Sequence, residues 1–182
     1  MRIDRLTGIV DAARQVASPN CDERPAGVAP ELIVLHGISL PPGRFGGDAI
    51  DRMFTNALPP DEHPYFREIA GLRVSSHLLV RRDGELVQYV PLHRRAWHAG
   101  DSCYRGRRTC NDFSIGIELE GVDDMPYADA QYARLAETLR ALFTTYPELD
   151  RRRIVGHCDI APGRKTDPGA AFDWPRLYHS LD

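Results

Sequence analysis

The sequence predicts a protein of the α/β or α+β class, in which strands and helices interleave around a sheet. Two observations predict this class: short apolar runs of strand length recur along the chain, and one long segment has helical periodicity. The 182 residues, 42% of them hydrophobic, are enough for one well-formed core. We therefore expect a single domain over residues 1–182, with an irregular N-terminal approach at 1–29 and the core at 30–175.

The first recognisable element follows an approach that is broken by the prolines at positions 19, 25 and 30. The apolar run Leu-Ile-Val-Leu at 32–35 predicts a strand that delivers His36 at its end. Segment 40–47, Leu-Pro-Pro-Gly-Arg-Phe-Gly-Gly, cannot be helix or interior strand because of its prolines and glycines. We expect a loop there, followed by a short helix at 49–56.

A hairpin is predicted in the middle of the chain. The runs 75–81 and 85–90 flank Arg-Asp-Gly at 82–84, and an Asp-Gly pair is the turn chemistry that two-residue hairpins require. Segment 114–120 then alternates, with isoleucine and leucine on one face and Glu118 and Glu120 on the other. A strand here places two carboxylates side by side on one face.

The last third of the chain predicts a long helix, a strand and a final helix. Apolar residues recur at helical spacing over 129–146, and a proline ends the run. Ile-Val-Gly at 154–156 predicts a short strand that leads into His157. Residues 174–181 predict a closing helix.

Composition restricts the classes of partner. A net charge of −3 and a pI near 6.2 argue against a general nucleic-acid binder, although the arginines at 105, 107 and 108 could form a local anion-binding patch or a solvated loop. No run of about 20 apolar residues is present, so we expect no spanning helix and no membrane partner. The first 21 residues lack the apolar core of a secretory signal, and the four cysteines lack CxxC spacing. We expect a cytoplasmic protein with reduced thiols and no obligate protein partner.

One loop concentrates the reactive residues. It runs Gly-His-Cys-Asp-Ile-Ala-Pro-Gly-Arg-Lys-Thr-Asp-Pro-Gly over 156–169 and contains a histidine, a lysine and two aspartates. With His36, it offers the two imidazoles and one carboxylate of an open zinc site, with water in the fourth position. Sequence spacing alone does not select the ligands, because His77 and His98 are equally available donors.

Four blocks of the chain resemble the AmpD-type N-acetylmuramyl-L-alanine amidases, a family related to phage lysozyme amidases and peptidoglycan-recognition proteins. The blocks are Val-Leu-His-Gly-Ile-Ser at 34–39, Ala-Trp-His-Ala-Gly at 96–100, Cys-Asn-Asp-Phe-Ser-Ile-Gly-Ile-Glu-Leu-Glu-Gly at 110–121, and the loop at 156–169. They lie in the family's order. The resemblance implies a central mixed sheet flanked by helices, and hydrolysis of the amide between the lactyl group of 1,6-anhydro-N-acetylmuramic acid and L-alanine during peptidoglycan recycling.

The resemblance also implies roles for individual residues. It assigns zinc to His36, His157 and Asp167, and it matches Glu118 to the family's proton-transferring glutamate. Glu120 shares the face of Glu118, and the sequence leaves open whether it shares the role. Lys165 lies two residues before the aspartate ligand, where its ammonium would stabilise the developing oxyanion.

Substrate contacts are implied for Trp97, whose flat ring suits a sugar face, and for Arg73, whose guanidinium suits a carboxylate or a sugar oxygen. The chain departs from the family at Gly37, where relatives have Asn, and at Thr109, where they have Arg. These departures leave open how the enzyme discriminates between anhydro and reducing sugars and between stem-peptide lengths.

Two rival functions remain at the level of sequence. A recognition module with the same fold would bind muramyl peptides without cutting them and would need no metal. A cysteine hydrolase would use Cys158 beside His157, but adjacent residues on an extended chain point to opposite sides and cannot pair directly.

Overall fold

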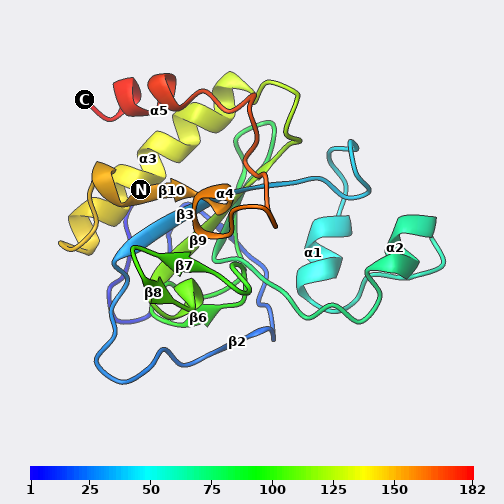
Figure 1. The fold of residues 1–182 in the computed structure, drawn as a ribbon, viewed down its shortest axis with the longest axis horizontal. Helices are drawn as coiled ribbons and strands as arrows, with labels where there is room; N and C mark the ends of the chain where they lie inside the picture. The colour runs from blue at the N-terminus through cyan, green and yellow to red at the C-terminus, as the bar shows by residue number, and fades with distance from the viewer.

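The computed structural model describes all residues from 1 to 182, and it is built on a mixed six-stranded sheet (Figure 1). The strand order is β1-β5-β4-β9-β3-β10, and only β4 and β5 run antiparallel to each other. The strands are β1 (Arg14–Gln15), β3 (Leu32–Ile38), β4 (Leu78–Val80), β5 (Leu86–Gln88), β9 (Ser114–Glu120) and β10 (Ile154–Gly156). The predicted class and the central mixed sheet are confirmed.

Strands β3 and β9 form the centre of the sheet, and their two faces bury different side chains. The apolar residues of one face pack against α3 (Asp129–Thr145) and α5 (Trp174–Ser180), which lie together along one side of the sheet in Figure 1. Both helices were predicted, and α3 is stabilised by apolar residues at helical spacing. The opposite face of β9 carries its two glutamates, and every residue of the strand is buried.

Two short helices, α1 (Ala49–Phe54) and α2 (Pro64–Glu68), lie side by side away from α3 (Figure 1). Helix α1 confirms the prediction for 49–56, whereas α2 was not predicted. Five residues are too few for a periodic pattern, and α2 is instead defined by its start: Pro64 is its first residue, and His63 Nδ1 accepts the Tyr65 N–H at 3.1 Å. Phe54 and Phe66 join these helices to a second apolar cluster.

The N-terminal approach is more ordered than the sequence predicted. Strand β1 adds a parallel edge to β5, and β2 (Cys21–Asp22) pairs with β6 (Arg95–Ala96). Strands of two residues are too short to show alternation, so they could not be predicted from the sequence. The other short elements are β7 (Cys103–Tyr104), β8 (Arg107–Arg108), the 3₁₀ helices η1 (Cys110–Asp112) and η2 (Arg151–Arg153), and α4 (His157–Ile160).

The predicted hairpin is present as β4 and β5, but its loop has three residues instead of two. The Gly84 N–H donates to Arg81 O, the Arg81 N–H donates to Glu85 O, and Gly84 has a φ of +86°. This is the turn followed by a left-handed glycine that three-residue hairpin loops use. The loop consists of residues 82–84, which the sequence placed between the two runs. Only the two-residue turn type expected from the Asp-Gly pair is wrong.

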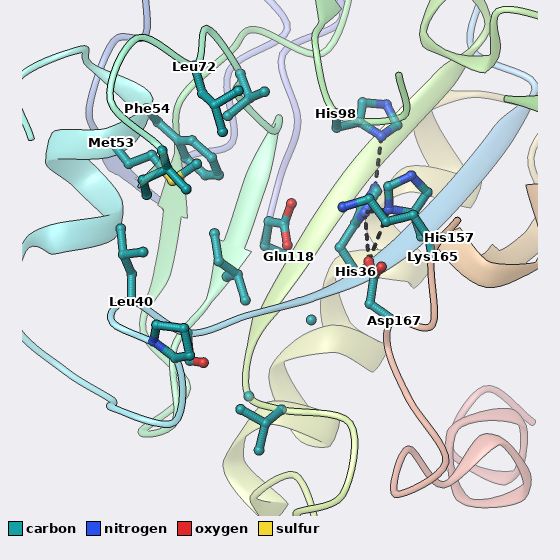
Figure 2. Close-up of a pocket in the computed structure, with 18 of the residues that line it drawn as sticks. His36, Leu40, Met53, Phe54, Leu72, His98, Glu118, His157, Lys165 and Asp167 are labelled. Carbon is teal, nitrogen blue, oxygen red and sulfur yellow. Dashed lines mark hydrogen bonds and ion pairs between the residues drawn. The ribbon is translucent and has the colours of Figure 1, made fainter. Parts of the chain in front are cut away.

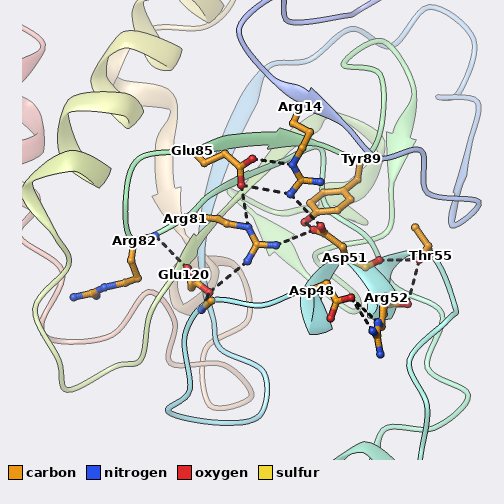
Figure 3. Close-up of polar contacts among 11 residues, drawn as sticks. Arg14, Asp48, Asp51, Arg52, Thr55, Arg81, Arg82, Glu85, Tyr89 and Glu120 are labelled. Carbon is orange, nitrogen blue, oxygen red and sulfur yellow. Dashed lines mark hydrogen bonds and ion pairs between the residues drawn. The ribbon is translucent and has the colours of Figure 1, made fainter.

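A charged cluster attaches α1 to the sheet (Figure 3). The Asp51 carboxylate of α1 accepts from Arg81 at 3.1 Å and from Arg14 at 3.0 Å, and the Tyr89 hydroxyl also donates to it. Charge-assisted hydrogen bonds of this kind are among the stronger polar contacts in proteins. They fix α1 as one wall of the pocket described below. All four cysteines are free thiols, as predicted, and none of the helices has the length and apolar composition needed to span a bilayer.

Candidate active site

Two histidines and an aspartate meet at the carboxyl ends of β3 and β10 (Figure 2). These strands are parallel neighbours with Gly156 opposite Leu35, so the next residues, His157 and His36, emerge side by side. The two Nδ1 atoms are 3.0 Å apart, and Asp167 Oδ2 lies 3.2 Å from His36 Nδ1 and 3.1 Å from His157 Nδ1. The structure thus brings together the three donors named from the sequence.

The protonation of these rings makes the cluster suited to a cation. His157 is 3% exposed, and its Nε2–H donates to Ala99 O at 3.1 Å, which leaves the Nδ1 lone pair facing the Asp167 carboxylate. Burial lowers the pKa of His36 to about 4, against the opposing effect of Asp167, so this ring is neutral near pH 7. Three acceptors facing one another at these separations repel unless a cation lies among them. A tetrahedral zinc site with metal–nitrogen bonds of about 2.0–2.1 Å would place its ligand atoms roughly 3.3 Å apart, which fits this donor set.

Glu118 lies beside the three donors because it pairs with His36 in the parallel ladder of β3 and β9. It is 7% exposed, and its carboxylate points into the pocket without a hydrogen bond to the protein (Figure 2). Burial raises its pKa well above the usual value; the charge of Asp167 adds to this, and Lys165 opposes it. Such a carboxyl group is placed to exchange a proton with a bound molecule.

The pocket extends from this polar end toward α1 and α2 and encloses about 460 Å³. Its far end is apolar, with Leu40, Met53, Phe54 and Leu72 among the side chains that Figure 2 shows facing it. The predicted loop 40–47 supplies part of this wall. A pocket with charged groups at one end and apolar walls at the other suits an amphipathic ligand.

Glu120, the second carboxylate on this face of β9, is occupied elsewhere (Figure 3). Its Oε1 accepts the Gly46 N–H at 2.6 Å, and its Oε2 accepts the Arg82 N–H at 3.1 Å. It does not line the pocket. Glu120 therefore joins loop 40–47 and the hairpin to β9, and the two glutamates that the sequence could not separate have different surroundings.

The three remaining predicted residues are placed differently. Lys165 is exposed and lines the pocket near His157 (Figure 2), and Trp97 is also among the residues that line the pocket. Arg73 is exposed and does not line the pocket, although its neighbours Leu72 and Val74 do. A substrate contact by Arg73 stays a prediction that this geometry does not support.

Comparison with known proteins gives the family. Residues 26–170 match the N-acetylmuramoyl-L-alanine amidase family. Over 170 residues the chain is 60% identical to the 1,6-anhydro-N-acetylmuramyl-L-alanine amidase AmpD of Escherichia coli K12, and the match covers 93% of this chain and 92% of that protein. The chain belongs to this amidase family, and within it to the AmpD type.

Solved structures of amidases agree with this placement. A crystal structure of a selenomethionine AmpD derivative matches with a TM-score of 0.96 at 56% identity, over 100% of both chains. The amidase AmiD of E. coli, in complex with the substrate anhydro-N-acetylmuramic acid-L-Ala-D-γ-Glu-L-Lys, matches with a TM-score of 0.60 at 30% identity. That match covers 94% of this chain and 62% of AmiD.

Within the amidase fold, Gly37 has a structural explanation. A Cβ atom at this position would lie 2.6 Å from the Tyr127 hydroxyl, and that hydroxyl donates to Pro168 O at 2.9 Å, next to Asp167. Tyr127 is buried and fills the space that an asparagine side chain would need. A side chain at position 37 would therefore require the Tyr127 hydroxyl to move.

Thr109 is strained, since it has a φ of 60° and a ψ of 59° at the start of η1. A β-branched residue in the left-handed region is a conformational outlier. Two neighbouring arginines form ion pairs at the surface: Arg107 pairs with Glu31, and Arg108 pairs with Asp101. Both lie outside the pocket lining.

The cysteine hydrolase alternative fails for a different reason from the one given by the sequence. His157 and Cys158 lie in α4 and not on an extended chain. Burial raises the pKa of the Cys158 thiol, and Asp159 raises it further, so the thiolate is disfavoured. Asp159 itself accepts the Gly156 N–H at 2.7 Å and caps this helix.

Sequence analysis missed the contacts that hold the histidines. His98 Nδ1 lies 2.9 Å from His36 Nε2, and Arg164 Nη2 donates to Ala99 O at 2.7 Å, the same oxygen that accepts from His157. His98 and Ala99 follow Trp97 in the second block that resembles the family, so the resemblance did indicate that this segment is important. The hydrogen bonds depend on the folded geometry and left no sign in the spacing.

Proposed function

We propose that this chain is a zinc-dependent amidase that hydrolyses the bond between the lactyl group of 1,6-anhydro-N-acetylmuramic acid and L-alanine, in cytoplasmic peptidoglycan recycling. The observation that carries the proposal is the cluster of two imidazole Nδ1 atoms and one carboxylate within 3.0–3.2 Å of one another, beside the unpaired carboxyl group of Glu118. The names of the AmpD and AmiD relatives supply the substrate class.

In this proposal, His36, His157 and Asp167 hold the zinc ion. Zinc bound there lowers the pKa of a bound water to about 7 and polarises the amide carbonyl. Two imidazoles and one carboxylate would supply three protein ligands to the ion. The same three-ligand arrangement with an open position is typical of catalytic zinc sites.

Glu118 moves the protons. Its carboxylate accepts a proton as water adds to the lactyl carbonyl carbon, and it then donates that proton to the alanine nitrogen as the C–N bond breaks. The products are a free lactyl carboxylate and a free peptide amine. The raised pKa of this buried group favours the protonated form that the second step needs, and the positive charges of a metal and of Lys165 favour the ionised form that the first step needs.

Lys165 and Trp97 complete the proposed site. The Lys165 ammonium lies on the pocket lining near His157, where it can stabilise the carbonyl oxygen as negative charge develops. Trp97 lines the pocket, and its flat apolar ring would suit the face of a sugar. We retain Arg73 only as a contact for a distal part of the stem peptide, because it lies outside the pocket lining.

We also propose that residues 1–182 fold as one amidase domain. The family match covers 26–170, and the residues before it contribute β1 to the same sheet. The four free thiols are typical of a reducing compartment such as the cytoplasm. The muramyl peptide is the partner in this account, which requires no nucleic acid, membrane or second protein.

The test is mass spectrometry of the products formed from anhydromuramyl-L-Ala-γ-D-Glu-diaminopimelate. The purified protein is expected to release the free tripeptide and anhydro-N-acetylmuramic acid, whereas His157→Ala should lose both bound zinc and product. Binding of the muropeptide without any release would contradict the amidase proposal and favour a recognition module.

A further inference from the structure

We infer that His98, oriented by Ser114, is a positioning residue that holds His36 in the one tautomer able to bind the metal. The inference rests on the proposed zinc site and concerns residues to which no role has been assigned above. It follows from the direction of three successive hydrogen bonds. Each proton can be placed, because the first group, the Ser114 hydroxyl, has only one.

The chain of hydrogen bonds begins at Ser114. Its hydroxyl lies 2.6 Å from Cys110 O, a carbonyl that can only accept, so the single hydroxyl proton is donated there. Ser114 Oγ also lies 3.1 Å from His98 Nε2. With its own proton used, the hydroxyl oxygen must accept, and His98 must carry its proton on Nε2.

The donor and acceptor roles in the next hydrogen bond, between His98 and His36, follow from this. The two ring nitrogens of His98 meet only Ser114 Oγ and His36 Nε2, with no carboxylate in contact to balance a positive charge, so the ring carries a single N–H. Its Nδ1 is therefore an acceptor, and it lies 2.9 Å from His36 Nε2, which must donate. His36 is left with an unprotonated Nδ1 that faces His157 and Asp167.

The reverse polarity is excluded by the structure. If Ser114 donated to His98, the proton on His98 would move to Nδ1 and the proton on His36 would move to its own Nδ1, where it would point at the metal position. Ser114 Oγ and Cys110 O would then be two acceptors 2.6 Å apart with no proton between them. The carbonyl of Cys110 thus sets the direction of the whole chain.

The fold makes room for this arrangement. A Cβ atom at Gly116 would lie 2.5 Å from the His98 ring, so the ring can lie on β9 only because position 116 is glycine. Ser114, Gly116 and Glu118 are alternate residues on one face of β9. One strand face therefore orients His98, gives it space, and supplies the proposed proton carrier.

The same segment orients the second histidine. Asn111 Oδ1 accepts the N–H groups of His98 at 3.1 Å and Ala99 at 2.8 Å, which fixes the backbone of both residues. Ala99 O then accepts from His157 Nε2 at 3.1 Å. Hydrogen bonds of this type orient metal-binding histidines and typically change metal affinity by about 10–100-fold when removed.

The experiment measures zinc affinity and ring tautomers, with no dependence on turnover. Zinc dissociation constants come from competition with a chromophoric chelator for the wild type, Ser114→Ala, His98→Phe and His98→Asn. The asparagine amide oxygen can take the place of Nδ1 and still accept from His36. We expect Ser114→Ala and His98→Phe to bind zinc about 10–100-fold more weakly, and His98→Asn to retain most of the affinity.

Ser76→Ala is the matched control, because Ser76 is a fully buried serine whose hydroxyl has no hydrogen-bond partner. It should leave zinc affinity unchanged. In the zinc-free protein, ¹⁵N spectra of the histidine rings should show His36 protonated on Nε2 alone, and Ser114→Ala should show both tautomers.

The outcomes separate this inference from the proposal on which it rests. A wild type that binds no zinc would overturn the metal assignment itself. A wild type that binds zinc with Ser114→Ala and His98→Phe equal to it would overturn the positioning role alone. A His36 ring protonated on Nδ1 in the zinc-free wild type would also overturn it.

Discussion

The two glutamates of β9 give a matched pair of variants that tests the proton-transfer role. Glu118→Gln keeps the shape of a side chain that is 7% exposed and makes no hydrogen bond to the protein, so it should fold and bind zinc normally. A positioned acid–base group contributes about 10²–10⁴-fold in rate. At about 1.36 kcal/mol per factor of ten, we expect kcat to fall by the equivalent of roughly 3–5 kcal/mol.

Glu120→Gln is the control from the same strand face. Glu120 accepts from the N–H groups of Gly46 and Arg82, so the amide would lose charge-assisted hydrogen bonds worth about 1–3 kcal/mol of folding stability. Its kcat should stay within a few-fold of the wild type. The assays are steady-state release of tripeptide, bound zinc by mass spectrometry, and thermal unfolding. If Glu118→Gln turned over at the wild-type rate, or if Glu120→Gln lost turnover to the same extent, the reasoning would be refuted.

Three further predictions concern stability. Gly37→Ala should destabilise the protein by about 1–3 kcal/mol through overlap with the Tyr127 hydroxyl. In a Tyr127→Phe background the same substitution should cost much less, which a double-mutant cycle measured by urea unfolding would show. Equal costs in both backgrounds would refute the overlap. Thr109→Asn should stabilise by about 1 kcal/mol because asparagine tolerates the left-handed region at a φ of 60°, and an unchanged unfolding midpoint would contradict the strain. Burial lowers the pKa of His77 to about 3, so the unfolded chain binds more protons there below about pH 6.5 and stability falls as the pH falls. His77→Asn can still accept the Gly116 N–H. In the zinc-free protein it should reduce the slope of unfolding free energy against pH by about 1.4 kcal/mol per pH unit between pH 6 and 4. An identical slope in both proteins would contradict a buried neutral ring.

Elements with a clear repeat could be predicted from the sequence. Strand β9 has the predicted bounds, and α3 differs from the prediction by one residue, because seven alternating residues and five helical turns leave little ambiguity. Helix α2 and strands β1 and β2 were missed, since elements of two to five residues contain less than one informative repeat. The hairpin loop was found from its Asp-Gly pair, but its length depends on Gly84 taking up the left-handed conformation.

The candidate site was also predicted only in part. The resemblance named His36, His157 and Asp167, and the structure brings them together at the ends of two parallel strands. Alternation placed Glu118 and Glu120 on one face, but the N–H groups that occupy Glu120 come from other loops, so strand periodicity could not separate them. The role inferred for His98 could not be predicted from the sequence, because the direction of each hydrogen bond depends on every group in the hydrogen-bonded series.

The central claim is that the two histidines and the aspartate hold one catalytic zinc ion. The most direct measurement is tripeptide release by the metal-stripped protein as zinc is added back in known amounts. The account predicts no turnover without metal, a linear rise with added zinc, saturation at one zinc per chain, and no recovery with magnesium, which prefers oxygen ligands. Full turnover by the stripped protein would contradict the account.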